Sequence, residues 1–328
     1  MTFSIIIPVY NAERKICKCF DSIKVQSFKD FEVVFVDDGS KDNSLQLLHS
    51  FYDNNPNLNI KIISQTNQGA GKARNNGISN SEGDYIVFLD SDDYVDDDYL
   101  KSVYEKIKCE NADVVFVDVI REKENGEIIR TEKMSQFQSL TKDSMIRAQL
   151  TGKMPWGGVR KIARASIIKD NNLGYAPIKV GEESIFSFRI LEEAKTVSFQ
   201  PLAIYHYVET ATSLTSHDEV VNSEKVFDYM YNYLKENGKL QKYITTVRSM
   251  AITTTAVGLN VLSNKKEWYD YYHEMKTLIK KYRPYFRGKI DFASLDSRVK
   301  VCYPFIVCGC PFPIILMSKL HTIIKKVL

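Results

Sequence analysis

The stretches that decide the fold are FEVVFVDDGS at residues 31–40 and YIVFLDSDD at residues 85–93. Each begins with a run dominated by β-branched and aromatic residues and ends in a cluster of aspartates. An apolar run without alternation is typical of a strand buried on both faces, as in a parallel sheet covered by helices. Both aspartate clusters therefore follow the carboxyl ends of strands, at the edge where open α/β sheets bind their ligands.

The same pattern extends over the first 120 residues. Strands are expected at residues 3–9, 32–36, 59–64, 85–89 and 114–119, and helices at residues 12–26, 42–52 and 71–79. Strands that alternate with amphipathic helices predict βαβ units and a mainly parallel central sheet, which is the α/β class. Residues 121–133 are charged and carry the turn signal Asn125-Gly126, which predicts a hairpin.

The remaining sequence has a different character. Short helices and strands mix up to residue 215, and helices rich in Tyr and Lys follow. We expect an α/β domain over residues 1–215, with halves at 1–120 and 121–215, then a helical region over 216–300 and an apolar and basic tail over 301–328.

Composition argues against several classes of protein. The net charge of +3 comes with no basic stripe interleaved with aromatics, so no nucleic-acid partner is expected. The six cysteines form no CxxC pair and have no histidine at zinc spacing, which is typical of reduced thiols in the cytosol. Residues 1–8 lack the basic start of a signal peptide. We therefore expect a cytoplasmic protein.

Aspartates are unusually dense over residues 90–98, where six of the nine residues are Asp. A helix cap explains a single aspartate at a strand–helix junction, such as Asp42 or Asp96. It explains Asp90 and Asp92 poorly, because two carboxylates separated by one residue repel each other. A divalent cation relieves that repulsion, and carboxylate oxygens suit Mg²⁺ or Mn²⁺. The pattern favours a metal site.

Residues 67–75 read NQGAGKARN, a segment whose backbone amides and two cations, Lys72 and Arg74, suit phosphate groups. Ala73 stands where a Walker loop has Ser or Thr, and GxGxxG is absent, so neither a P-loop nor a nicotinamide site is supported. A solvated surface lysine is the alternative for Lys72.

Four blocks of sequence, in the right order, resemble family 2 glycosyltransferases of the bacterial capsule and exopolysaccharide type. They are SIIIPVYN at 4–11, QSF at 26–28 with FEVVFVDDGSKDNS at 31–44, NQG at 67–69 with ARN at 73–75 and Gly77, and EGDYIVFLDSDD at 82–93. The resemblance covers about the first 100 residues. It implies a GT-A nucleotide-diphospho-sugar transferase fold, an inverting reaction and a divalent metal at the D-x-D element.

The resemblance also implies roles for single residues. Tyr10 would lie against the nucleotide base, and Asp38 would accept a hydrogen bond from it. Asp90 and Asp92 would hold the metal and the ribose–phosphate region, with Asp92 the more direct metal ligand. With Lys72 and Arg74 from the segment above, the donor-binding residues expected in full are Pro8, Tyr10, Asp38, Lys72, Arg74, Asp90 and Ser91.

Residues 181–186, GEESIF, resemble the family's Glu-Asp-x-x-Phe element, whose second acid is the usual catalytic base. Glu183 stands where Asp is usual, so the carboxylate is retained but moved by one methylene. The alternative is that Glu182 and Glu183 only place charge at a helix N-terminus.

Trp156 and Glu182 are candidates for the acceptor side, although a core position suits Trp156 almost as well. His206 could complete the metal shell, but an ordinary strand histidine is the better interpretation.

These features predict a non-processive, inverting transfer from a nucleotide-diphospho-sugar, with a UDP-sugar favoured, to a hydroxyl of a glycan acceptor. Residues 1–120 would bind the donor and residues 121–215 the acceptor, expected to be a lipid-linked surface glycan. A processive polysaccharide synthase is one alternative, but its Gln-x-x-Arg-Trp element is absent. A nucleotide-sugar-binding scaffold without catalysis and a nucleotidyltransferase are the others.

The uncharged run at residues 301–318 approaches the length of a membrane span. Pro304, Gly309, Pro311 and Pro313 interrupt it, so a spanning helix is not expected. From Ile314 onward, apolar residues and lysines alternate at helical spacing, which predicts peripheral contact with an anionic membrane, on the cytoplasmic face of the inner membrane. Packing of the apolar run back onto the protein is the alternative.

Overall fold

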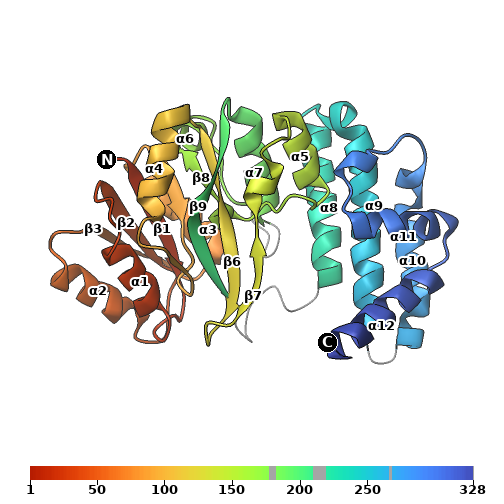
Figure 1. The fold of residues 1–328 in the computed structure, drawn as a ribbon, viewed down its shortest axis with the longest axis horizontal. Coiled ribbons are helices and arrows are strands. Elements are labelled where there is room, and N and C mark those ends of the chain that lie inside the picture. Colours follow the sequence, from red (N-terminus) through yellow and green to blue (C-terminus); the bar gives the residue numbers. More distant parts are fainter. Residues whose placement is uncertain (177–181, 210–218, 266–267, 328) are drawn as a thin grey trace. The chain divides into compact units, whose positions relative to one another are not determined.

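The computed structural model describes residues 1–176, 182–209, 219–265 and 268–327 (Figure 1). The chain divides into two units, residues 1–142 with 156–213 and residues 143–155 with 214–328. Residues 143–155 thus belong with the C-terminal helices, whereas the sequence analysis grouped them with the first 215 residues.

The first unit is built on a nine-stranded sheet with the order β3-β2-β1-β4-β8-β6-β9-β5, in which β7 pairs with β6. The strands are β1 (Phe3–Val9), β2 (Phe31–Asp37), β3 (Asn59–Ser64), β4 (Tyr85–Phe88), β5 (Tyr94–Val95), β6 (Val114–Lys123), β7 (Ile128–Glu132), β8 (Lys161–Arg164) and β9 (Val197–Glu209). The five strands predicted from periodicity are all present, and β1 and β3 have the predicted bounds.

The sheet changes character at β4. Strands β3, β2, β1 and β4 are parallel, as predicted, and β1 and β2 are buried along their whole length. Beyond β4 the sheet is mixed, because β8 runs antiparallel to both β4 and β6 while β9 runs parallel to β6. The predicted hairpin is confirmed by the antiparallel pairing of β6 with β7.

The helices of the first unit are α1 (Ile16–Lys24), α2 (Ser44–Asn54), α3 (Ala70–Asn80), α4 (Tyr99–Glu110), α6 (Ala165–Asp170) and α7 (Glu182–Glu193). Helix α1 begins four residues later than predicted. The amide of Ala12 donates to Ser44 Oγ at 2.8 Å, and the amide of Glu13 donates to Asp42 Oδ2 at 3.1 Å. These hydrogen bonds tie residues 12–13, which lie between β1 and α1, to the start of α2.

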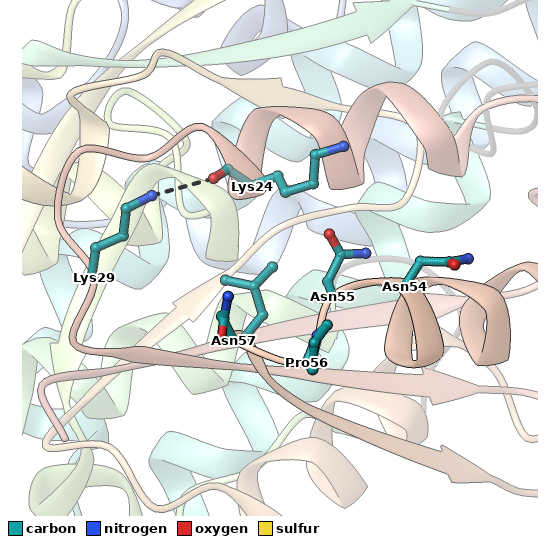
Figure 2. A pocket seen from close by; sticks show the side chains of 7 residues that line it. Lys24, Lys29, Asn54, Asn55, Pro56 and Asn57 are labelled. Carbon is teal, nitrogen blue, oxygen red and sulfur yellow. Dashed lines mark hydrogen bonds between the residues drawn. The ribbon is translucent and has the colours of Figure 1, made fainter.

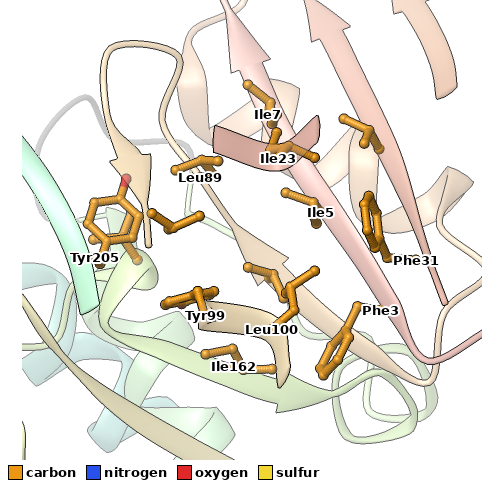
Figure 3. Packing of buried hydrophobic residues seen from close by; sticks show 14 of the residues in the cluster. Phe3, Ile5, Ile7, Ile23, Phe31, Leu89, Tyr99, Leu100, Ile162 and Tyr205 are labelled. Carbon is orange, nitrogen blue, oxygen red and sulfur yellow. The ribbon is translucent and has the colours of Figure 1, made fainter. Parts of the chain in front are cut away.

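The core of the first unit fills the space between the sheet and its covering helices (Figure 3). Phe3 and Ile5 from β1 lie with Ile23 from α1 and Leu100 from α4, all buried. On α3, a Cβ at Gly77 would lie 2.3 Å from Ile6 Cγ2. Because that contact is too short for any Cβ, glycine allows α3 to approach β1 closely. This approach sets the position of Arg74, one turn earlier in α3.

In the second unit α9 (Leu240–Asn264) is contacted by α8 (Glu219–Glu236), α10 (Tyr272–Tyr282), α11 (Ser297–Cys308) and α12 (Phe312–Val327). The segment 143–155 includes all but the first residue of α5 (Lys142–Leu150). From α5, Arg147 Nη1 donates to Thr246 Oγ1 on α9 at 2.8 Å.

The tail consists of helices α11 and α12. Helix α11 ends at Cys308 and is capped by Gly309, with φ +77°, and α12 starts after Pro311. The interruption expected there is present, whereas Pro304 lies inside α11. Ile314 and Ile315 are buried, so part of the apolar run packs onto the protein. Among the described residues, no helix has both the length and the apolar character that crossing a membrane requires. The side chains from Leu320 onward lie outside the described part of the chain.

Candidate active site

The candidate site lies at the carboxyl ends of β1, β2 and β4, which meet at one edge because the three strands are parallel. Tyr10 directly follows β1 and is 50% exposed, whereas Pro8 is buried inside the strand, opposite Val36. Asp38 follows β2, and the Asp90-Ser91-Asp92 element follows β4. The sequence prediction that both acidic pairs share this edge of the sheet is confirmed.

Asp38 is 3% exposed and fully engaged by the loop between β3 and α3. Its carboxylate accepts hydrogen bonds from Gln65 Nε2 at 2.7 Å, from the Gln68 amide at 2.9 Å and from the Gly69 amide at 2.8 Å. Hydrogen bonds to a charged group are among the stronger ones in proteins. Asp38 therefore fixes the start of α3, and its contact with a nucleotide base stays a prediction.

Arg74 links the end of β4 with the start of α7. Its buried guanidinium donates from Nη2 to Asp90 Oδ1 at 2.7 Å, and its Nη1 lies 3.9 Å from Glu183 Oε1. Burial alone would lower the pKa of Arg74, but the charge of Asp90, with Tyr175 and Glu183, raises it well above its usual value. The sequence analysis assigned Arg74 to phosphates, a contact that stays a prediction. Lys72 is exposed on the same helix.

Asp92 and Asp93 have different surroundings although they are adjacent. The Asp92 side chain is 38% exposed, and Lys15 Nζ lies 3.6 Å from its Oδ2. Asp93 is buried and accepts hydrogen bonds from Tyr205 Oη at 2.6 Å and from the Val208 amide at 2.8 Å. Burial, and then the charge of Asp90, raise the pKa of Asp92. Asp93 is therefore part of the scaffold, while Asp92 remains accessible to a ligand.

The acids at the end of β4 fit a metal that arrives with a diphosphate. Among the described residues, no three His, Cys, Asp or Glu side chains converge as a complete metal site. Mg²⁺ is commonly held by one or two carboxylates together with substrate phosphates, so Asp90 and Asp92 are a sufficient protein contribution. Half-buried Ser91 lies between them. His206 bonds instead to Asp96 at 2.9 Å, which favours the ordinary strand role.

Glu183 lies against the Gly157-Gly158 turn. An added Cβ at either glycine would lie 3.3 Å from a carboxylate oxygen of Glu183. At Gly158 it would also lie 2.5 Å from Tyr175 Oη, and at Gly157 it would lie 2.1 Å from Arg160 Nη1. The two glycines thus leave room for a glutamate in this position. Trp156 precedes them and is half-buried, while the side chain of Glu182 lies outside the described part of the chain.

Sequence reasoning missed several residues around the site. Tyr205 holds both Asp93 and the Asp90 amide, the latter at 3.1 Å, and Lys161 contacts the turn beside Glu183. Nothing in the sequence around Tyr205 indicates contact with residues over 100 positions away. No sequence motif around Lys161 indicates that it lies near the site.

A separate hollow of about 410 Å³ lies at the opposite edge of the sheet (Figure 2). It is lined by Lys24, Lys29 and residues 54–58, which precede β2 and β3. Lys29 Nζ donates across it to the Lys24 carbonyl oxygen at 3.3 Å. Because it lies at the amino ends of the strands, it is not part of the candidate site.

Comparison with known proteins agrees with this geometry. Residues 4–175 match the model of Glycosyl transferase family 2. The chain is 30% identical over 253 residues to the putative glycosyltransferase EpsH of Bacillus subtilis, covering 73% of this chain and 71% of EpsH. It is 29% identical to the poly(ribitol-phosphate) beta-N-acetylglucosaminyltransferase TarS of Staphylococcus aureus, over 70% of this chain but only 39% of TarS.

The fold is also that of a solved relative. The crystal structure of S. aureus TarS 1–349 in complex with UDP-GlcNAc matches with a TM-score of 0.70, covering 98% of this chain and 92% of that one at 23% identity. The predicted GT-A fold is thereby confirmed. The family match, which spans just over half of the chain, and the identity with EpsH place the protein in a known class of enzymes. The chain belongs to glycosyl transferase family 2, and it is a glycosyltransferase.

Proposed function

We propose that this enzyme transfers one sugar at a time, with inversion, from a UDP-sugar to a hydroxyl of a glycan acceptor in surface polysaccharide biosynthesis. The observation that carries the proposal is the Arg74 bridge, 2.7 Å from Asp90 and 3.9 Å from Glu183. A single displacement needs a base on the acceptor side and charge neutralisation on the leaving-group side. At one end of the bridge Glu183 would supply the base, and at the other Asp90 would help to hold the cation that neutralises the leaving diphosphate.

Glu183 is assigned as the base. Its carboxylate would take the proton of the acceptor hydroxyl while the acceptor oxygen forms a bond to the anomeric carbon. The bond from that carbon to the diphosphate oxygen breaks on the opposite face, so the configuration inverts. Gly157 and Gly158 leave space beside Glu183, which supports this role for a glutamate where the family usually has Asp. Trp156 and Glu182 are assigned to the acceptor side.

Asp90 and Asp92 are assigned to a divalent metal, Mg²⁺ or Mn²⁺, with Asp92 as the direct ligand because it is the more exposed carboxylate. When bound, the metal would supply positive charge to the leaving diphosphate. Lys72 is exposed on α3 and would add positive potential near the phosphates.

Uridine is the proposed base of the donor. Support comes from TarS, whose structure was solved with UDP-GlcNAc and whose fold this chain shares. Exposed Tyr10, at the end of β1, presents an aromatic ring where a base would stack. The name of TarS specifies a poly(ribitol-phosphate) acceptor for that protein. For this chain we propose a lipid-linked glycan.

A lipid-linked acceptor would favour attachment to the membrane, and the tail offers a surface for it. Val301, Phe312 and Leu316 are exposed on α11 and α12, while Ile314 and Ile315 on the other side are buried. Apolar side chains next to lysines suit the interface of an anionic leaflet. We assign α11 and α12 to peripheral contact with the cytoplasmic face of the inner membrane.

Flotation with anionic liposomes tests the attachment. Phe312→Ser with Leu316→Ser should reduce flotation at low and high salt. The matched control, Ile128→Ser with Leu202→Ser, removes two exposed apolar residues of the first unit and should float like wild type. Substitution is preferable to deletion, which would uncover the partners of Ile314 and Ile315. If both double variants float equally well, the tail does not attach the protein to the membrane.

A thermal-shift screen of nucleotide-sugars in the presence of Mn²⁺ tests the donor. A ligand that binds only the native state raises the melting temperature by mass action. We expect a UDP-sugar to give the largest shift and to be turned over. A larger shift with a GDP- or TDP-sugar would contradict the uridine assignment, and binding without transfer or hydrolysis would indicate a scaffold.

A further inference from the structure

Lys161 is a buried cation with an unusual set of partners. It opens β8, is 3% exposed, and donates from Nζ to the carbonyl oxygens of Trp156 at 2.5 Å and of Gly157 at 3.0 Å. Among the described residues, no carboxylate forms an ion pair with this amine. Burying an ammonium without a counter-charge is unfavourable, because the charge loses its hydration. An apolar side chain would fill the space at lower cost, so the hydrogen bonds indicate a specific role.

The two carbonyl groups belong to the turn that contacts the candidate base. Gly157 and Gly158 lie so close to Glu183 that an added Cβ on either would be 3.3 Å from its carboxylate. Arg160 packs against the same turn, since an added Cβ at Gly157 would lie 2.1 Å from its Nη1, but its guanidinium donates to Glu132 Oε2, at 2.6 and 2.9 Å, and not to the carbonyl groups of the turn. In the described part of the chain, Lys161 is therefore the cation that donates to the carbonyl oxygens of this turn and so links the turn to β8.

We propose that Lys161 is a positioning residue, which fixes the turn of residues 156–158 and thereby holds Glu183 and Trp156 in place for the acceptor. The inference rests on the proposed function, because it assumes that Glu183 is the base. Turnover then requires Lys161, although its side chain contacts neither the donor nor the acceptor.

The surroundings of the Lys161 amine also make its charge sensitive to pH. Burial lowers the pKa of Lys161 to about 7, an effect that the negative charge of Glu183 opposes and the positive charge of Arg160 reinforces. These are the charged groups that face the amine, Glu183 from α7 and Arg160 from the turn before β8. Loss of the proton leaves two N–H donors but removes the positive charge that strengthens both hydrogen bonds, so the hold on the turn should weaken as pH rises through 7.

The first test uses fluorescence, which does not depend on activity. Trp156 and Trp268 are the only tryptophans, so Trp268→Phe leaves Trp156 as a reporter of the turn. In that background the emission of Trp156 should change with a midpoint near pH 7, and Lys161→Met should abolish the transition. Lys142→Met is the matched control, since Lys142 also donates to two carbonyls, of Glu192 at 3.1 Å and Ala194 at 2.7 Å, but at an exposed position. A transition that persists in Lys161→Met would overturn the proposal.

The second test uses steady-state kinetics with the donor found in the screen. Lys161→Met should lower kcat by roughly 100-fold, the effect of a small misplacement of a catalytic group. KM for the donor should stay within about twofold, because donor binding is unaffected by an acceptor-side change. Lys161→Gln keeps an N–H donor and should recover part of kcat. An unchanged kcat in Lys161→Met, or no recovery in a folded Lys161→Gln, would contradict the role.

The two tests separate the possible failures. A wild-type protein that transfers no sugar would refute the proposed function, while the fluorescence titration would still decide whether Lys161 holds the turn.

Discussion

The ends of β2 and β4 carry similar acidic sequences but use them differently. At the end of β2, Asp38 is buried and its oxygens accept three hydrogen bonds from the loop before α3. At the end of β4, Asp92 is 38% exposed, and Lys15 Nζ lies 3.6 Å from its Oδ2. An acid that the chain satisfies is part of the scaffold, whereas an acid left accessible beside another carboxylate can receive a ligand. The two carboxylates differ in the hydrogen-bond donors that surround them, although the acidic sequences are similar.

The largest expected effect is at Asp92. Asp92→Asn should lower turnover by about 10³-fold, since groups that stabilise developing charge contribute on that scale. Its stability without metal should be equal or slightly higher. Burial and Asp90 raise the pKa of Asp92 in the folded state, so the charged form costs stability once pH rises through that pKa, and asparagine removes the cost. Normal turnover, or a wild-type enzyme fully active in excess chelator, would show that the metal assignment is wrong.

Glu183→Gln should lower turnover by about 10²-fold, which is within the range for loss of a general base. Donor affinity should be almost unchanged, because the base acts on the acceptor in the transition state. Donor titrations and single-turnover rates check this, with Glu182→Gln as the adjacent control. If Glu182→Gln is the variant that binds donor without turnover, the base is one residue earlier.

Glu132 is a third kind of acid, one whose carboxylate forms ion pairs with arginines. Burial alone would raise the pKa of Glu132, but the charges of Arg160 and Arg121 lower it to about 2. Glu132→Gln should cost about 2 kcal/mol at pH 7, which allows for partial solvent screening. A lowered carboxyl pKa contributes stability that is complete above the unfolded value near 4.5 and is lost as pH falls toward 2. Urea unfolding at pH 7 and pH 3 should therefore show a smaller difference at the lower pH; a constant difference would argue against the ion pairs.

The smallest expected effect is at Asp38. Asp38→Asn replaces an acceptor oxygen by a donor that faces amide donors, which should cost about 1.5 kcal/mol of unfolding free energy. Turnover should fall much less than in Asp92→Asn. If Asp38→Asn loses donor binding at unchanged stability, then Asp38 contacts the base, and the contrast between the two strand ends would not hold.

The sequence predicts the part of the fold that depends on local patterns. Strands β1 and β3 are recovered with their full bounds, and the apolar runs of β2 and β4 give the position of the acidic clusters that follow them. The four residues of β8, Lys161–Arg164, have no such pattern, so the antiparallel half of the sheet could not be placed. Helix α1 starts at Ile16 and not at residue 12, and the amides of residues 12–13 bond instead to Ser44 and Asp42, a long-range contact that the local pattern does not contain.

Prediction of the site from the sequence is limited in the same way, because local patterns do not show long-range contacts. Asp92 and Asp93 are equivalent in sequence, and only the distant Tyr205 identifies Asp93 as structural. Arg74 was predicted to face phosphates, but its carboxylate partners lie on other elements of the chain. Long-range partners therefore decide roles that residue type and spacing leave open.

Calorimetric titration of UDP-GlcNAc, with and without Mn²⁺, tests the central claim most directly. The claim is that the acids at the end of β4 bind a metal and those at the end of β2 do not. For wild type and Asp38→Asn, Mn²⁺ should tighten binding at least about tenfold, or 1.4 kcal/mol. For Asp92→Asn, Mn²⁺ should make no difference. Measurable binding by the wild-type protein with the same affinity in both conditions would contradict the account.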